Sequence, residues 1–123
     1  MSKKPSLAER LEAVQERSTL RLTTHGRKTS KPHTVTIWFL VDGEAVYLVT
    51  MRLGRDWPRN LIKNGYAELA VGGASFTGHA KQIKDAKRLA RVNQLLCQKY
   101  WAAWLGSWLG FGPEGAFMVS IRE

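Results

Sequence analysis

The chain has 123 residues, and its 19 lysines and arginines against 10 acidic residues give a net charge of +9 at pH 7. Such a surplus favours an anionic partner: a nucleic acid, an acidic lipid surface or a phosphorylated ligand. The cations are spread from Lys3 to Arg122, which argues against a nucleic-acid-binding arm. The length and the 44% hydrophobic content suit one domain (1–123) with a sizeable core and exclude two.

The cysteine count and the hydropathy pattern indicate the cellular compartment in which the protein is expected. Cys97 is the single cysteine, so an intrachain disulfide is excluded. No apolar run approaches the roughly 18 residues of a membrane span, and charged residues stand where a signal peptide would be apolar. We therefore expect a cytoplasmic protein. The three histidines are isolated from carboxylates and from the cysteine, so we expect no metal site.

The N-terminal residues predict an amphipathic helix within 1–18. Leu7, Leu11 and Val14 recur at helical spacing behind Ser6, and Glu9 completes a capping-box pattern. The basic, amphipathic character of this helix leaves peripheral contact with an acidic membrane open, although its glutamates oppose it.

The pattern then changes to that of antiparallel strands. Residues 20–23 alternate between apolar and polar side chains, and residues 34–41 are rich in β-branched and aromatic residues. Asp42-Gly43 is typical of a hairpin turn. The further strands that we expect are 45–51, 66–71, 75–83 and 116–121.

Two more helices are predicted between these strands. Asp56 is placed to cap a short helix that ends at Asn64-Gly65. Asp85 begins the longest helix, whose apolar residues recur at intervals of three or four. The order predicts a mainly β (α+β) fold, a closed or nearly closed six-stranded antiparallel barrel with an N-terminal helix, a short helix and one long helix. Barrel closure is favoured because it removes exposed strand edges.

The segment 22–33, between the first two expected strands, is the strongest functional signal. It contains Gly26, followed by Arg27, Lys28 and two hydroxyl residues. Gly26 permits backbone angles closed to other residues, so that successive amides can converge on a phosphate while the cations supply charge. A solvated basic turn is the alternative interpretation.

This segment resembles a known signature. The run LTTHGRKTSKPHT, Leu22 to Thr34, resembles the "LTTxGRKSGKPRxT" signature of deazaflavin-dependent nitroreductases and quinone reductases in the flavin-binding split-barrel superfamily. The run DWPRNLIKN, Asp56 to Asn64, is similar to the "DWxxNLxxNP" stretch of that family. The two motifs occur in the family's order, and the resemblance covers residues 20–83.

The resemblance implies a homodimeric split barrel that binds the deazaflavin coenzyme F420 or, in other branches, FMN. It implies that Arg27 and Lys28 pair with the phosphate and acidic tail, that Thr29 donates a hydrogen bond, and that Trp57 and Asn60 form a wall and an orienting group at the ring. We add two arginines on the basis of charge and expected proximity. The expected cofactor-binding residues are Gly26, Arg27, Lys28, Thr29, Trp57, Asn60, Arg52 and Arg55.

The function that follows from the resemblance is an oxidoreductase using reduced F420 for hydride transfer. The acceptor is apolar or conjugated, such as a quinone, a nitro compound or an unsaturated lipid. No nucleophile or metal is then required, because the cofactor carries the difficult step. The alternatives are an FMN-dependent oxidoreductase and a non-catalytic flavin-, haem- or fatty-acid-binding protein of the same fold. We expect no nucleic-acid partner, because the tryptophans cluster on a helix.

The acceptor side of the site is less defined. Trp101, Trp104 and Trp108 recur at helical spacing, which is typical of a core or dimer interface and also fits a pocket for a flat apolar substrate. Tyr100 is a candidate catalytic proton donor, or else a packed residue with its hydroxyl at the rim. Trp38 is interpreted first as a core residue.

Overall fold

The computed structural model describes residues 5–100 and 115–122. Three helices lie in this part of the chain: α1 (Leu7–Glu12), α2 (Asp56–Asn64) and α3 (Ala86–Lys99). Its strands are β1 (Leu20–His25), β2 (Pro32–Ile37), β3 (Phe39–Asp42), β4 (Ala45–Thr50), β5 (Tyr66–Val71), β6 (Ala74–Gln82) and β7 (Gly115–Arg122).

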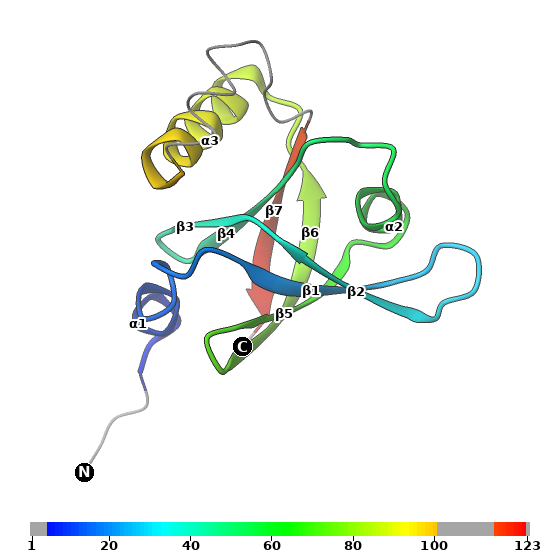
Figure 1. Cartoon of the computed structure of the whole chain (residues 1–123), viewed down its shortest axis with the longest axis horizontal. Helices are drawn as coiled ribbons and strands as arrows, with labels where there is room; N and C mark the ends of the chain where they lie inside the picture. Colours follow the sequence, from blue (N-terminus) through cyan, green and yellow to red (C-terminus); the bar gives the residue numbers. More distant parts are fainter. Residues whose placement is uncertain (1–4, 101–114, 123) are drawn as a thin grey trace.

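These strands form one curled antiparallel sheet in the order β2-β1-β5-β6-β7-β4-β3. Figure 1 shows that the sheet bends round into an open half-barrel, with α2 beside the β1–β2 hairpin. The mainly β α+β class is therefore confirmed.

The number of strands is not the expected one. The described residues form seven strands, because the strand expected at 34–41 is divided at Trp38. The residues before Trp38 pair with β1, whereas those after it pair with β4. β2 and β3 are thus the two opposite edges of the sheet, and Trp38 alone joins them. We call this residue the seam of the barrel.

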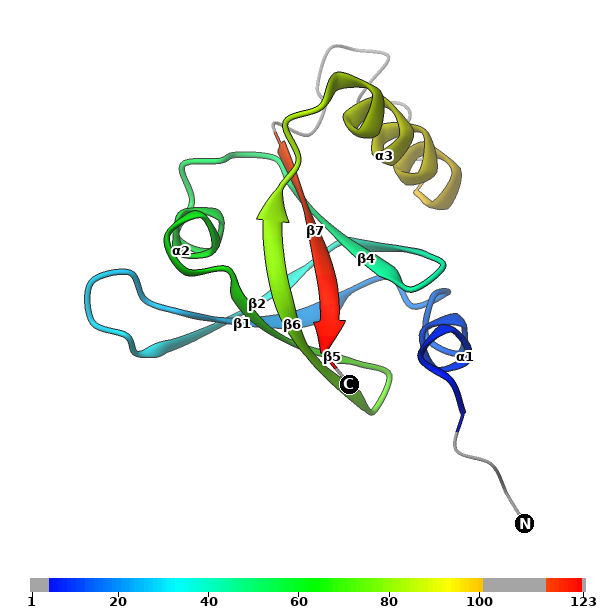
Figure 2. The ribbon, with the colours of Figure 1, turned by 180° about the vertical axis from the view of Figure 1, so that it is seen from behind.

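Successive side chains of a strand point to opposite faces of the sheet, and the core is accordingly divided into two clusters. In β4, Val46 and Leu48 belong to an inner cluster inside the curl, and Val49 belongs to an outer cluster under α3. α3 packs on β3 and β7 (Figure 2). The other buried members of the outer cluster are Leu40, Ile83, Val92, Leu96 and Ala116.

α1 is shorter than the helix expected within residues 1–18. Ser6 caps it as predicted, since its Oγ accepts a hydrogen bond from the Glu9 amide at 3.2 Å. After Glu12 the backbone continues in tighter turns that bond three residues apart, which ends the α-helix. Leu7, Leu11 and Val14 are buried in the inner cluster. The apolar face that contact with a lipid surface would need is therefore used inside the protein.

The caps of the two longer helices differ. Asp85 begins α3 as predicted, because its side chain accepts a hydrogen bond from the Arg88 amide. The prediction that Asp56 caps α2 is wrong. Arg55 is the N-cap residue and Asp56 is the first helical residue. The Asp56 carboxylate is instead used to pair with Arg27.

A substitution at Gly78 tests the close contact between β6 and β7. A Cβ added there would overlap the Ser120 carbonyl oxygen and lie 2.8 Å from Cγ1 of Val119. We expect Gly78→Ala to lower the free energy of unfolding by about 1–3 kcal/mol, measured by urea denaturation. Gly54→Ala is the control, since a Cβ there meets no described atom within 4 Å. Equal stability of the two variants would contradict this packing.

The pH dependence of stability tests the buried contact that Lys99 makes at the C-terminal end of α3. Its Nζ donates to the Phe39 carbonyl at 3.0 Å, and burial lowers the pKa of Lys99 to about 8, while Glu16 opposes the shift. Between this pKa and that of an unfolded lysine, the unfolded state binds more protons, so stability rises with pH. We expect the gain in unfolding free energy from pH 7.5 to 9.5 to be smaller in Lys99→Met than in the wild type. Lys87→Met, an exposed change on the same helix, should keep the full gain, and an unchanged gain in Lys99→Met would refute the assignment.

Candidate functional site

The segment predicted to bind an anion is the hairpin loop between β1 and β2. Two backbone hydrogen bonds close it, from the Gly26 amide to the Lys31 carbonyl at 2.8 Å and from the Ser30 amide to the Gly26 carbonyl at 2.9 Å. The loop lies against α2 (Figure 1). The sequence places Arg27 directly after Gly26, so the arginine stands at the point where the loop meets the helix.

Asn60 fastens this loop to the barrel. Its Oδ1 accepts hydrogen bonds from the Arg27 amide at 3.2 Å and from Nη1 of Arg27 at 3.0 Å. Its Nδ2 donates to Oγ1 of Thr24 in β1 at 3.1 Å. Asn60 is only 2% exposed and Thr24 is 0% exposed. Buried amides and hydroxyls need partners, so these contacts fix helix, strand and loop relative to one another.

Gly26 has a different role from the expected one. Among the described residues the glycines with positive φ are Gly43, Gly72 and Gly73, and in this loop the positive angle, 59°, belongs to Ser30. A Cβ on Gly26 would lie 3.1 Å from Oγ1 of Thr29. Gly26 therefore sits in a tightly packed turn without an unusual backbone angle, and a Cβ there would require the exposed Thr29 side chain to shift slightly.

The loop, the start of β2 and α2 line an open cavity of about 200 Å³, which we call the basic cavity. Its lining residues are Gly26, Arg27, Lys28, Thr29, His33, Asp56 and Asn60. Nη1 of Arg27 also lies 3.3 Å from Oδ1 of Asp56, whose side chain is 78% exposed. An ion pair this exposed is weak. The structure thus brings together five of the predicted residues and adds a carboxylate and an imidazole.

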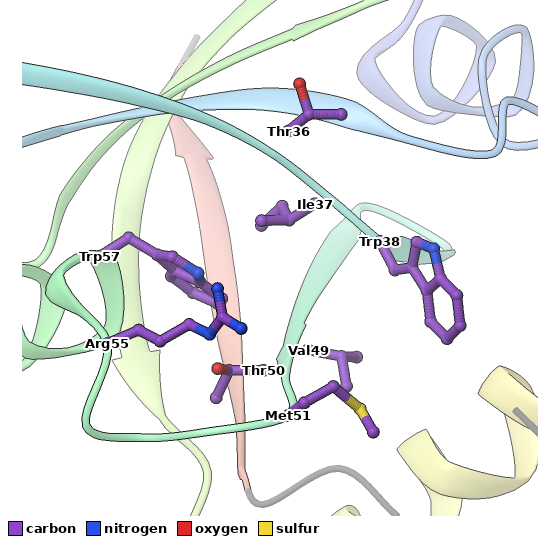
Figure 3. Close-up of a pocket in the computed structure, with 8 residues that line it drawn as sticks. All are labelled: Thr36, Ile37, Trp38, Val49, Thr50, Met51, Arg55 and Trp57. Atoms are coloured by element: carbon purple, nitrogen blue, oxygen red, sulfur yellow. The ribbon is translucent and has the colours of Figure 1, made fainter. Parts of the chain in front are cut away.

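A second cavity of about 260 Å³ opens at the seam, and we call it the apolar cavity. Its lining residues are Thr36, Ile37, Trp38, Val49, Thr50, Met51, Arg55 and Trp57 (Figure 3). Trp57 is buried and packs on Phe117 with ring centroids 5.7 Å apart. Arg55 contributes the charge in this lining, whereas Arg52 is exposed on the preceding loop and lines neither cavity.

The two cavities are neighbours in the fold. Arg55 and Trp57 line the apolar cavity, and Asp56 between them lines the basic one. β2 is shared in the same way, with His33 at the basic cavity and Ile37 at the apolar cavity. One ligand with an anionic part and a flat apolar part matches this arrangement.

The predicted acceptor residues are placed differently. Tyr100 lines neither cavity: its hydroxyl lies 2.6 Å from the Ser18 carbonyl oxygen and 3.1 Å from that of Phe39. Burial raises the pKa of the Tyr100 hydroxyl, while the Phe39 backbone opposes the shift. Trp101, Trp104 and Trp108 lie outside the described residues.

Several site residues were not predicted. Thr24 and Met51 received no role from the sequence, and Trp38 was interpreted as core. Within the described ranges no group of three histidine, cysteine or acidic side chains is close enough to hold a metal ion. Nor is any helix there long and apolar enough to cross a membrane.

Solved structures resemble this open split-barrel fold at low sequence identity. An F420-H2 dependent reductase (FDR-A) has a TM-score of 0.67 and 17% identity, over 84% of this chain and 94% of that chain. A conserved hypothetical protein from Mycobacterium tuberculosis has a TM-score of 0.77 and 19% identity, over 98% and 82%. A third structure, described as a domain-swapped dimer, has a TM-score of 0.69 and 17% identity, over 84% and 80%. No curated protein sequence matches the chain.

The family described as F420H(2)-dependent quinone reductase matches residues 4–104. The chain belongs to this family. It is therefore an oxidoreductase, and its cofactor is coenzyme F420.

Asn60→Ala tests the junction of loop, helix and strand. The change leaves the Thr24 hydroxyl and the Arg27 amide without their partner, and we expect it to lower the free energy of unfolding by about 2–3 kcal/mol. Asn64→Ala, an exposed change one turn later in α2, should cost less than about 0.5 kcal/mol. Urea denaturation of both variants measures the difference, and similar losses would show that Asn60 has no special part in stability.

Proposed function

We propose that the basic cavity binds the phosphate and acidic tail of coenzyme F420, that the apolar cavity binds its ring, and that the chain reduces an apolar or conjugated acceptor such as a quinone. The observation that supports this most is that both cavities are lined by consecutive residues at the start of α2. A single extended cofactor with a charged and a flat part requires such a pair.

The side chains of the basic cavity suit an anion. Arginine presents a planar group of donors that matches phosphate and carboxylate oxygens, and lysine adds a mobile charge. Arg27 is half-buried and held by Asn60, whereas Lys28 and Thr29 are exposed and accessible to a ligand. We assign Asn60 the role of orienting Arg27 and not a direct role at the ring.

The apolar cavity suits a flat ring. Trp38, Trp57 and Ile37 supply apolar surface from the seam, from α2 and from β2 (Figure 3). Arg55 supplies a cation at the same cavity and would pair with a polar edge of the ring or with the phosphate. Arg52 lines neither cavity, and we give it no part in binding.

When bound, reduced F420 supplies a hydride to the acceptor. The residues of the chain then have to bind, orient and exclude water, and tightly held walls serve this purpose. Trp57 is held by the inner cluster through Phe117, and Arg27 is held by Asn60, so both parts of the site are arranged before a ligand enters.

The acceptor class and the oligomeric state belong to the same proposal. The family description favours a quinone, and nitro compounds and unsaturated lipids share its flat or apolar character. A homodimer is supported by the structural likeness to a protein described as a domain-swapped dimer.

Replacing both cations of the loop tests the proposal. We expect Arg27→Ala/Lys28→Ala to weaken F420 binding by more than about 2 kcal/mol, because two charge-assisted contacts are lost together. Fluorescence titration with F420, and separately with FMN, at low and moderate salt measures the change.

The matched control is Lys87→Ala/Arg88→Ala, which removes the same charge from the exposed surface of α3. It should change affinity little at moderate salt, where distant charges are screened. Equal losses in the two double variants would mean that the net charge, not the loop, attracts the cofactor. Preference for FMN would support the FMN-dependent alternative, and binding of neither ligand would refute the proposed site.

A further inference from the structure

We propose that Tyr100 is a positioning residue that holds the Trp38 indole in place as one wall of the apolar cavity. What that cavity binds rests on the proposed function. The placement of Trp38 by Tyr100 rests on the contacts below.

The seam leaves Trp38 without the support that strand residues have. It belongs to neither β2 nor β3, and the pairing register with β1 ends at Ile37 while that with β4 begins at Phe39. Residues inside a ladder are fixed by hydrogen bonds and by cross-strand neighbours. The Trp38 side chain packs against the outer cluster, and a further contact is needed to fix its ring plane and give the cavity a defined wall.

Tyr100 supplies this contact at the end of α3. Its ring stacks on the Trp38 indole, with ring centroids 4.6 Å apart and planes 7° apart. Stacked aromatic pairs contribute beyond their buried area. The residue on which Tyr100 stacks is thus one of those that line the apolar cavity.

The Tyr100 hydroxyl also fixes the backbone that follows Trp38. It hydrogen-bonds to the Ser18 carbonyl at 2.6 Å, lies 3.1 Å from the Phe39 carbonyl, and accepts weakly from the Phe39 amide at 3.5 Å. Lys99 adds a hydrogen bond to the same Phe39 carbonyl. β3 is an edge strand, so its outer backbone groups lack a strand partner. Tyr100 therefore controls both the ring plane of Trp38 and the direction of the chain after it.

The opposite wall is independent of Tyr100. Trp57 packs on Phe117 in the inner cluster, on the other side of the cavity from α3 (Figure 3). Loss of the Tyr100 ring should displace Trp38 and leave Trp57 in place. A general loss of folding would disturb both tryptophans.

The first test observes the two walls directly and needs no ligand. The full chain is labelled with 5-fluorotryptophan, and its ¹⁹F signals are assigned with Trp38→Phe and Trp57→Phe. We expect Tyr100→Leu to shift or broaden the Trp38 signal and to leave the Trp57 signal unchanged. Tyr100→Phe keeps the stacked ring and should change the Trp38 signal less. Tyr66→Phe, which removes an exposed hydroxyl bonded to Glu68, is the control. A Trp38 signal that Tyr100→Leu leaves unmoved would overturn the inference.

The second test measures the consequence for binding. We expect Tyr100→Leu to weaken F420 binding about tenfold and Tyr100→Phe about threefold. Binding of inorganic pyrophosphate, a probe of the basic cavity, should remain within about twofold of the wild type in both variants. Unchanged F420 affinity in Tyr100→Leu, with a displaced Trp38, would show that the indole is not a wall of the binding site.

A double-mutant cycle of Tyr100→Phe and Trp38→Leu keeps the inference testable if Tyr100→Leu does not fold. If Tyr100 acts through the indole, Tyr100→Phe loses its effect on F420 affinity in the Trp38→Leu background. Additive effects would contradict the positioning role. A proton donor would instead lose turnover in Tyr100→Phe with unchanged F420 affinity. If the wild type binds neither F420 nor FMN, the proposed function fails, and the ¹⁹F signals still decide whether Tyr100 places Trp38.

Discussion

The buried amide of Asn60 is the interaction on which the arrangement of the site depends. It is the one side chain that contacts, at hydrogen-bonding distance, both the loop through Arg27 and the sheet through Thr24 in the described part of the chain. An amide suits this position because it offers an acceptor and a donor from one planar group. A buried aspartate could accept from Arg27 but, while ionised, could not donate to Thr24. The loop is therefore held by the core of the barrel and not only by its own turn.

The seam at Trp38 has an equally direct effect on the apolar cavity. A sheet whose two edges are consecutive strands cannot continue its ladder through the joining residue, so a gap opens beside that residue. The inner and outer clusters meet at this gap, with Ile37 and Trp57 from one and Val49 and Trp38 from the other. The cavity thus arises from the topology, and its walls belong to two differently supported parts of the core. The basic cavity, by contrast, is made by the β1–β2 loop, the start of β2 and one helix.

Much of this arrangement could be predicted from local patterns. The alternation at Leu20 and Leu22, the Asp42-Gly43 turn and the Ser6 and Asp85 caps depend on neighbouring residues, and each predicted its element. The division at Trp38 could not be predicted, because residues 34–41 read as one continuous strand and only pairing with different partners separates them. The ion pair of Asp56 was missed for a similar reason: a cap and a distant partner both suit an aspartate before a helix, and only the fold brings Arg27 near. In the candidate site, the cations Arg27 and Lys28 could be recognised from the sequence, and their role in binding stays a prediction. The contacts of Asn60 and the walls of the apolar cavity depended on residues far apart in sequence.

In the proposed anion site, the half-buried Arg27 guanidinium is held by two partners of different strength, Asn60 and Asp56. Nη1 of Arg27 is contacted by Asn60 from the buried side and by Asp56 from the exposed side. The Asn60 contact is part of the folded core, so under the proposed function it would persist on anion binding. The Asp56 contact is exposed to water, contributes little energy and can be replaced by phosphate or carboxylate oxygens. Under the proposed function only the weak partner would have to leave, so little reorganisation would oppose anion binding, and such preorganisation favours both affinity and a fixed orientation of the anion.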